Sequence, residues 1–354
     1  MTIVGIVGAG VMGAGIAQVA LEAGWEVVVH DVDPDAIEHA KDSVREGLAR
    51  RAAKLDLDPD SIEAWVDGRL AGLRHAHVLD GLATEASLII EAALEDLDLK
   101  RTIFRALGAE APPEVILASN TSALSISEIA GATDRPDRVI GLHFFNPVPL
   151  MALVEVVPGS STAPGTIERA EDVVRAWGKT PVRSADRPGF IVNRVNRPYT
   201  IEALRMLEDG VADVMAIDEA MRLAGFPLGP FELMDLSGLD VNLAAARGVW
   251  TGLGEPARLQ PSRIQKRLVA TGRLGRKTGA GFYRYADGRR GDVDPEFARP
   301  PGRPLGADKI RARIEAAIVD EARYAIDEGV ASSDDVVTAL RLGAGHPERF
   351  LATL

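Results

Sequence analysis

The stretch Ile3-Val-Gly-Ile-Val-Gly8-Ala-Gly10-Val-Met-Gly13 decides the fold of the first part of this chain. Its first five residues form a short β-rich run, and the glycines that follow have the spacing Gly-x-Gly-x-x-Gly. The pattern next predicts a helix as far as Glu22 and a second buried strand over residues 26–30. Asp31 stands at the end of that strand, 18 residues after Gly13. Strand, turn, helix, strand and acid together predict a βαβ unit.

Each part of this unit has a physical task in binding a dinucleotide. Gly8 allows the tight turn, Gly10 lets the backbone approach a pyrophosphate, and Gly13 allows close helix packing. The helix N-terminus offers unpaired N–H groups and a positive dipole. Asp31 would accept hydrogen bonds from the adenosine ribose and repel a 2′-phosphate, which favours NAD over NADP. The alternative is a glycine-rich turn without a ligand, and the strand context and the spacing of the acid count against it.

Composition limits the classes of protein to which the chain can belong. Its 354 residues suggest about two or three domains, and 46% hydrophobic content can bury a sizeable core. The net charge of −12 argues against nucleic-acid binding through a general basic surface. The absence of cysteine excludes thiol chemistry, disulfides and cysteine-bound zinc. No signal segment or membrane-length apolar run is visible, so we expect a cytoplasmic protein without a membrane anchor.

The stretch from residue 119 to residue 155 places reactive side chains among apolar ones. His143 is flanked by Leu142 and Phe144, and Glu155 stands in Leu-Val-Glu-Val-Val. Each would be costly to bury without a partner, and a separation of 12 residues allows two adjacent strands joined by a turn. We therefore expect them to face each other. A histidine backed by a carboxylate can take a proton from an alcohol while hydride leaves for nicotinamide. A satisfied core histidine is the alternative.

Other charged residues have both a functional and a structural interpretation. Glu95 and Lys100 follow a predicted strand, where they would flank a cofactor at the edge of a parallel sheet. They equally suit a first-turn acid and a surface lysine of the next helix. Arg50, Arg51 and Lys54 end a long charged helix. These three could meet a ligand phosphate, or they could simply be solvated.

Together with further motifs, these residues resemble the L-3-hydroxyacyl-CoA dehydrogenase (3-hydroxybutyryl-CoA dehydrogenase) family, which oxidises the 3-hydroxyl of fatty acyl-CoA thioesters with NAD. The motifs span about the first 285 residues and are Gly8 to Gly15, Ser119-Asn-Thr-Ser122, Gly141-Leu-His-Phe-Phe-Asn-Pro147, Leu153-Val-Glu155, Pro188-Gly-Phe-Ile-Val-Asn193-Arg194 and Gly275-Arg-Lys-Thr-Gly-Ala-Gly-Phe282. The resemblance implies an α/β Rossmann-type domain followed by an all-α domain like that of 6-phosphogluconate dehydrogenase. It also implies NAD as the cofactor and an acyl-CoA as the substrate.

The resemblance assigns roles to individual residues. It makes His143 and Glu155 the catalytic pair, and it implies that Ser122 and Asn193 hold the reacting oxygens of the substrate. It implies cofactor contacts from Gly8, Gly10, Val11, Met12, Gly13, Asp31, Glu95, Lys100, Ser122 and Lys277. Lys54 would touch the CoA moiety. Gly47 departs from the family pattern, because it stands where a relative can carry a hydroxyl for CoA.

The chain changes character at Asp186-Arg-Pro-Gly189, where βα alternation gives way to helices. We expect a cofactor domain over residues 1–186, a helical domain over 187–286 and a linker over 287–306. Asn193 is expected on the first turn of a helix that runs from Phe190 to Glu208. The glycine-rich basic segment 272–281 either borders the cofactor or forms a mobile surface turn.

A partial second helical repeat is predicted over residues 307–354. Glu202-Ala203, Gly210-Val-Ala212 and Ala220-x-Arg-Leu223 reappear as Glu321-Ala322, Gly329-Val-Ala331 and Ala339-x-Arg-Leu342, each displaced by 119 residues. Chance similarity between two amphipathic helix pairs is the alternative. If the repeat is real, we expect the second copy to pack on the first and occupy the surface through which short relatives dimerise. The chain would then be a monomer with an internal pseudo-dimer, and otherwise a homodimer.

The residues leave three functions open. The predicted one is NAD-dependent oxidation of a 3-hydroxyacyl-CoA. The second is oxidation of a small hydroxy acid of the sugar-acid or carnitine type. The third is a dinucleotide-binding structural or sensor protein without activity.

Overall fold

The computed structural model describes residues 2–55, 57–298 and 305–354. The chain divides into two compact units, residues 1–186 and residues 187–354. The division lies within the segment where the sequence pattern changes. No helix among the described residues is both long and apolar enough to cross a membrane.

The first unit contains an eight-stranded sheet with the order β3-β2-β1-β4-β5-β6-β7-β8. The strands are β1 (Ile3–Val7), β2 (Glu26–His30), β3 (Leu73–His75), β4 (Leu88–Glu91), β5 (Ile116–Ser119), β6 (Val139–Phe144), β7 (Leu153–Pro158) and β8 (Thr180–Arg183). The helices are α1 (Val11–Glu22), α2 (Pro34–Ala52), α3 (Pro59–Leu70), α4 (Leu79–Glu85), α5 (Leu97–Glu110), α6 (Ile126–Ala130) and α7 (Pro164–Ala176), with the short 3-10 helix η1 (Pro136–Arg138). Neighbouring strands are parallel except β6 and β7, which pair antiparallel.

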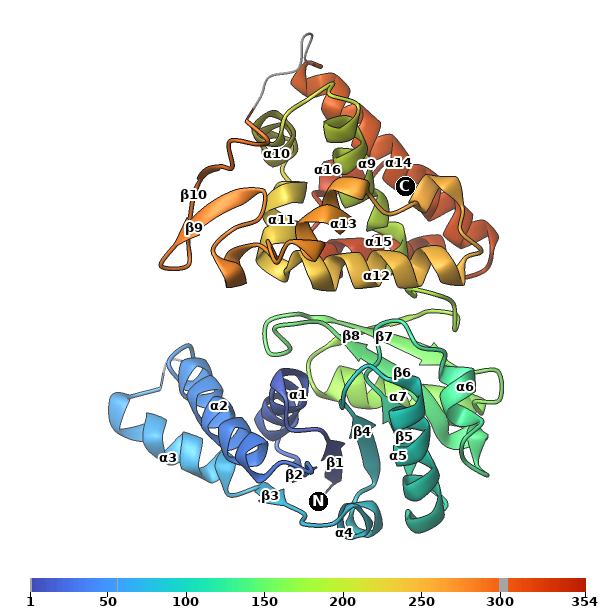
Figure 1. Ribbon diagram of the computed structural model, residues 1–354. Helices are drawn as coiled ribbons and strands as arrows, with labels where there is room; N and C mark the ends of the chain where they lie inside the picture. The colour runs from blue at the N-terminus through green and yellow to red at the C-terminus, as the bar shows by residue number, and fades with distance from the viewer. Residues whose placement is uncertain (1, 56, 299–304) are drawn as a thin grey trace. The chain divides into compact units, whose positions relative to one another are not determined.

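Helices cover both faces of this sheet (Figure 1). On one face, α1, α2 and α7 bury apolar side chains against alternate residues of the strands. In β6 these core residues are Ile140, Leu142 and Phe144. Because successive strand residues point to opposite faces, His143 belongs to the other face. Strand alternation therefore separates the reactive histidine from the main apolar core.

The second unit is mostly helical. Its helices are α8 (Val192–Val195), α9 (Arg197–Glu208), α10 (Val214–Leu223), α11 (Pro230–Ser237), α12 (Leu239–Gly252), α13 (Arg263–Ala270), α14 (Ala307–Asp327), α15 (Ser333–Ala344) and α16 (Glu348–Leu351), with the 3-10 helices η2 (Ala257–Leu259) and η3 (Arg276–Thr278). The helix predicted from Phe190 to Glu208 is divided between α8 and α9. Pro198 stands in the first turn of α9, where its missing N–H is tolerated, and it could not continue an unbroken helix.

Two predictions for the second unit need correction, because a β-hairpin lies in the domain expected to be all helical. The strands β9 (Tyr283–Ala286) and β10 (Arg289–Val293) pair antiparallel, and the second falls in the predicted linker. Asp287 and Gly288 both have positive φ, as a type I′ hairpin turn requires. Val293 and Phe297 are buried, so this part of the predicted linker belongs to the folded unit. Residues 299–304 of that linker lie outside the described residues.

The second copy of the repeat packs on the first. Helix α14 contacts α8, α9 and α10, and α15 contacts α8. The predicted apolar face of α14 is buried, with Ile310, Ile314 and Ile318 almost inaccessible to solvent. The expectation that the two copies pack together within the chain is therefore confirmed.

Ion pairs show that this packing is reciprocal. Arg194 Nε and Nη1 donate to Glu321 Oε1 at 2.9 Å and to Glu328 Oε2 at 2.8 Å. Arg313, which lies 119 residues after Arg194, bonds to Glu202 and Asp209, which lie 119 residues before those two acids. Such an exchange of equivalent contacts is the signature of a two-fold interface. It argues for a true duplication over a chance likeness of two helix pairs.

A second set of contacts agrees with this pseudo-two-fold relation. A Cβ atom on Gly225 would lie 3.3 Å from Pro347, and one on Gly345 would lie 3.1 Å from Pro227. These pairs correspond at an offset of 120 residues, one more than in the helices before them. The rings of the equivalent residues Phe226 and His346 contact each other, with their centroids 5.0 Å apart. The two copies thus keep one symmetric interface across both of their helical hairpins.

Candidate active site

The glycine turn between β1 and α1 has the geometry of a dinucleotide site. Gly8 has φ of 104°, and a Cβ atom there would lie 2.7 Å from the Ala92 carbonyl oxygen. A Cβ atom on Gly13 would lie 1.9 Å from the Gly8 oxygen, whereas nothing lies within 4 Å of one on Gly10. The turn is therefore tight at its first and last glycines and open at the middle one. A pyrophosphate fits that open position, next to the first N–H groups of α1.

Asp31 is connected to this turn through the pairing of β1 with β2. Its Oδ2 accepts from Ala9 N at 2.7 Å, and its Oδ1 accepts from Asp33 N at 3.0 Å. The parallel register sets Val7 opposite His30, so the acid follows β2 beside the turn that follows β1. A ribose would meet this carboxylate at the carboxyl edge of the sheet.

Large apolar side chains are exposed at the same edge. Val11, Val32 and Leu94 follow β1, β2 and β4, and they are 74%, 93% and 78% exposed. These strands are neighbours and run parallel, so their carboxyl ends meet at one edge. Apolar surface left open beside a phosphate turn suits a flat, partly apolar ligand such as an adenine or nicotinamide ring.

A buried charge network lies behind Glu95. Lys100 and Glu91 are fully buried, with Lys100 Nζ 2.6 Å from Glu91 Oε1 and 3.6 Å from Glu95 Oε2. Ser119 Oγ donates to the other oxygen of Glu91 at 2.6 Å. A buried charge needs such partners. Lys100, which was predicted to contact a cofactor, has no exposed surface. Its ammonium group instead faces the carboxylates of Glu91 and Glu95.

Ser122 is connected to the same network. Its backbone N–H and its Oγ donate to Glu95 Oε1 at 2.8 and 3.1 Å, and Thr121 Oγ1 donates to that oxygen at 2.7 Å. Three donors on one oxygen fix the loop after β5 relative to Glu95. Sequence reasoning missed Glu91 and Thr121, although Glu91, like Glu155, is an acid within an apolar strand.

His143 and Glu155 lie directly opposite each other on β6 and β7. The antiparallel register pairs them, and His143 Nδ1 is 2.6 Å from Glu155 Oε2. Glu155 is fully buried, while the histidine side chain keeps 8% exposure. The expectation that the two residues face each other is confirmed. A buried carboxylate on Nδ1 fixes the tautomer of the imidazole.

Asn193 and Lys277 belong to the second unit. Asn193 lies on α8, and Arg197 Nε donates to its carbonyl oxygen at 3.3 Å. Lys277 lies on η3 and donates to Asp240 at 2.7 Å. This hydrogen bond lowers the pKa of Asp240. This exposed ion pair connects the glycine-rich loop with α12.

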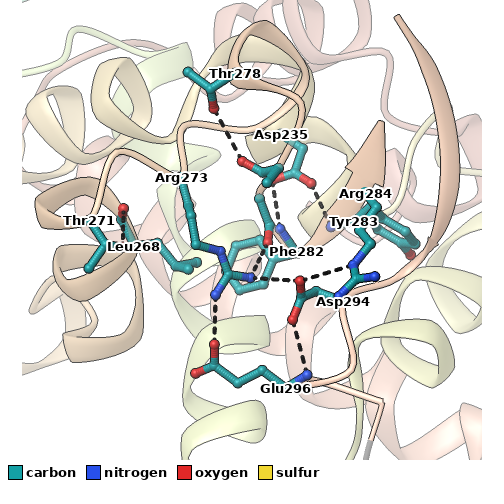
Figure 2. Close-up of polar contacts among 12 residues, drawn as sticks. Asp235, Leu268, Thr271, Arg273, Thr278, Phe282, Tyr283, Arg284, Asp294 and Glu296 are labelled. Carbon is teal, nitrogen blue, oxygen red and sulfur yellow. Dashed lines mark hydrogen bonds and ion pairs between the residues drawn. The ribbon is translucent and has the colours of Figure 1, made fainter. Parts of the chain in front are cut away.

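Asp235 anchors the end of the loop that carries Lys277. Its carboxylate accepts from Phe282 N at 3.1 Å and from Tyr283 N at 2.9 Å, and Figure 2 shows these contacts beside Arg273. Burial raises the pKa of Asp235 to about 6. A Cβ atom on Gly281 would lie 2.0 Å from Asp235 Oδ1. Segment 272–281 therefore lies against Asp235 at Gly275 and Gly281, while residues 276–279 are exposed.

Both halves of this arrangement match one family. Residues 3–187 match the NAD-binding domain of 3-hydroxyacyl-CoA dehydrogenase, and residues 189–285 match its C-terminal domain. The chain belongs to the 3-hydroxyacyl-CoA dehydrogenase family. It is an NAD-dependent oxidoreductase, so the predicted family, cofactor and order of a Rossmann-type domain before a helical one are confirmed.

Relatives of two lengths resemble this chain. The 3-hydroxyadipyl-CoA dehydrogenase of Escherichia coli (strain K12) is 42% identical over 86% of this chain and 64% of that protein. Mitochondrial hydroxyacyl-coenzyme A dehydrogenase of Rattus norvegicus is 44% identical over 79% of this chain and 90% of that protein. The crystal structure of 3-hydroxybutyryl-CoA dehydrogenase from Escherichia coli K12 substr. MG1655 covers 99% of this chain and 90% of that chain, with 34% identity and a TM-score of 0.88. That structure therefore extends over the second helical copy.

A pocket on the first unit contains the residue that family resemblance connects with CoA. It has a volume of about 580 Å³, and its lining includes Arg50, Arg51, Lys54 and Lys179. Burial lowers the pKa of Lys179 to about 8, and its Nζ donates to the Val148 and Met151 carbonyls. These cationic side chains line the same pocket. This arrangement favours binding of a ligand phosphate over the alternative that the cations are only solvated.

The departure at Gly47 has a structural counterpart in this pocket. A Cβ atom on Gly47 would lie 2.0 Å from Gln18 Oε1, so the Gln18 side chain occupies the space that a residue at 47 would need. Gln18 Nε2 donates to Glu22 Oε1 at 2.7 Å, and both residues line the pocket. An amide therefore stands in the pocket wall where a relative can carry a hydroxyl.

Proposed function

We propose that this chain oxidises L-3-hydroxyacyl-CoA to 3-ketoacyl-CoA with His143 as the general base. The observation that carries the proposal is the 2.6 Å contact of His143 Nδ1 with the buried Glu155. NAD, when bound, accepts the hydride that leaves C3 of the substrate. His143 takes the hydroxyl proton, and Glu155 orients the ring and stabilises the imidazolium that forms. The C3–H bond and the O–H bond break together with formation of the carbonyl.

We assign Ser122 and Asn193 to the reacting oxygens of the substrate. Ser122 suits this role because Glu95 fixes its loop at the carboxyl edge of the sheet. Asn193 offers an amide from the first helix of the second unit. The Asn193 amide would donate to the reacting oxygen, and a donor in place before the reaction costs no reorganisation as charge develops there, whereas Ser122 Oγ, whose proton goes to Glu95, would accept from the substrate hydroxyl.

The CoA part of the substrate is assigned to the pocket that contains Lys54. Lys54 follows the end of α2, and Arg50 and Arg51 lie on its last turn. CoA carries several phosphate oxygens, and guanidinium and ammonium groups are their usual partners. A small hydroxy acid without phosphates would have no use for these cations.

Formation of NADH with a panel of substrates tests this function. With NAD present, we expect turnover of short, medium or long 3-hydroxyacyl-CoAs and none of carnitine or free sugar acids. NADP in place of NAD serves as the control, since Asp31 should repel its 2′-phosphate. Turnover of a free hydroxy acid alone would favour the second candidate function. NAD binding without turnover of any member would favour a sensor or structural protein.

We also propose that the second helical copy takes the place of a second chain, which leaves the protein monomeric. The reciprocal ion pairs of Arg194 and Arg313 support this, because an intrachain two-fold interface already covers the surface that a partner would use. Light scattering on the full chain is expected to give the mass of one chain. A dimer held through α8 and α9 would contradict the proposal.

A further inference from the structure

Arg194 follows Asn193 directly and is completely buried. Its guanidinium bonds to two carboxylates of the second copy, Glu321 on α14 at 2.9 Å and Glu328, the C-cap of α14, at 2.8 Å. The hydrogen bond from Arg194 lowers the pKa of Glu328. Since a buried guanidinium is costly without an opposite charge, these two acids hold the residue next to Asn193 in place.

Further contacts restrict the same turn of helix. Arg258 Nε donates to Glu321 Oε2 at 2.7 Å, so Glu321 receives both arginines while it is itself buried. Arg197 is also buried, and its Nε donates to the Asn193 carbonyl. Helix α8 is only four residues long, so its own hydrogen bonds contribute little to its rigidity. Its position is therefore set by these side chains together with its packing against α12, α14 and α15.

We propose that Glu321 is a positioning residue for Asn193, so that the second copy supports the active site through Arg194. This inference rests on the proposed role of Asn193 in holding a reacting oxygen. A glutamate in the last third of the chain, 127 residues after Arg194, then sets the place of an amide that contacts substrate. The second copy has lost that amide itself, because Ala312 stands at the position equivalent to Asn193.

The alternative is that these ion pairs only stabilise the contact between the two copies. The equivalent ion pair on the other side of the interface provides a control that distinguishes positioning from stabilisation. Arg313 and Glu202 form the equivalent pair on the other side of the pseudo-two-fold relation. Arg313 is preceded by Ala312 in place of an asparagine. Loss of either pair should weaken the interface, but only the Arg194 side adjoins a residue assigned to substrate.

The test compares Glu321→Gln with Glu202→Gln in the full chain. Glutamine keeps the shape of the side chain and removes its charge. For Glu321→Gln we expect kcat to fall about 10-fold to 10²-fold, the effect of a misplaced group near the chemistry, with the Kd of NAD unchanged. For Glu202→Gln we expect kcat within about twofold of the parent, since no substrate contact depends on it. Thermal unfolding of both variants reports the stability cost separately.

A double-mutant cycle with Asn193→Ala distinguishes positioning from general damage. If Glu321 acts through Asn193, adding Glu321→Gln to Asn193→Ala should lower kcat little further. Equal loss of kcat in Glu321→Gln and Glu202→Gln, or independent effects in the cycle, would overturn the inference. Full activity of Asn193→Ala would instead overturn the assigned role of Asn193. If Glu321→Gln does not fold, Glu328→Gln removes the more exposed partner of Arg194 and is expected to lower kcat in the same direction.

Discussion

Replacing His143 by alanine is expected to lower turnover of a 3-hydroxyacyl-CoA by roughly 10²–10⁴-fold, which is the usual worth of a positioned general base. The substitution removes the group that receives the hydroxyl proton, while the glycine turn and Asp31 are untouched. The Kd of NAD should therefore stay near that of the parent. Steady-state kinetics with NADH absorbance and a fluorescence titration with NAD measure the two quantities.

His39→Ala is a suitable control for this experiment. His39 lies on the exposed face of α2, so its loss removes an imidazole without touching the β6–β7 pair. We expect it to keep full turnover. Undiminished turnover of His143→Ala would refute its assignment as the base. A large loss of NAD affinity in that variant would show that the histidine supports the cofactor site and not the proton transfer.

A chain that ends at Ala298 is expected to lose its monomeric state. The cut follows the buried Phe297, so the β9–β10 hairpin remains complete while α14, α15 and α16 are removed. Arg194 would keep neither Glu321 nor Glu328, and with α14 removed its guanidinium would meet water without an acidic partner. The apolar side chains that now face α14 would also meet water.

Two copies of the shortened chain can recover these contacts from each other. Because the interface is reciprocal, Arg194 of one copy would meet Glu202 and Asp209 of the other. Light scattering should therefore show a dimer or larger species, and thermal unfolding should occur at a lower temperature than in the full chain. Glu202→Gln in the shortened chain should weaken the dimer, whereas in the full chain it should leave the mass unchanged. A stable, monodisperse shortened monomer would contradict the proposal that the second copy replaces a partner.

Local features of the fold could be predicted from the sequence because local residue types decide them. The glycine spacing and Asp31 identified the cofactor turn, and Gly8 and Gly13 indeed stand where a Cβ atom would collide with backbone. The turn at Asp287-Gly288 was equally local and was missed, because the surrounding glycines and charges were interpreted as a linker. Its signal was the Asp-Gly pair between two strand-like segments.

The network behind Glu95 shows where prediction from single residues ended. Lys100 was expected at the cofactor or at the surface, and it is buried between Glu91 and Glu95. The helix pattern alone does not reveal this, since a lysine on the first turn of α5 reaches Glu91 only because the tertiary fold brings that turn back to the end of β4. The burial of a charge depends on what packs over it.

By itself, the sequence determined the chemistry available to this protein. The identities and spacings of residues specified a phosphate turn, a histidine with a nearby acid, and a repeat displaced by 119 residues. Tertiary structure alone decided which charges meet. The antiparallel register of β6 and β7 brings His143 Nδ1 to Glu155, and the crossing of α14 over α8 and α9 exchanges Arg194 and Arg313 between the two copies. Backbone preferences act over a few residues, whereas these contacts join residues that are 12 positions apart in the first case and more than a hundred in the second, so only the packing of complete helices and strands selects them.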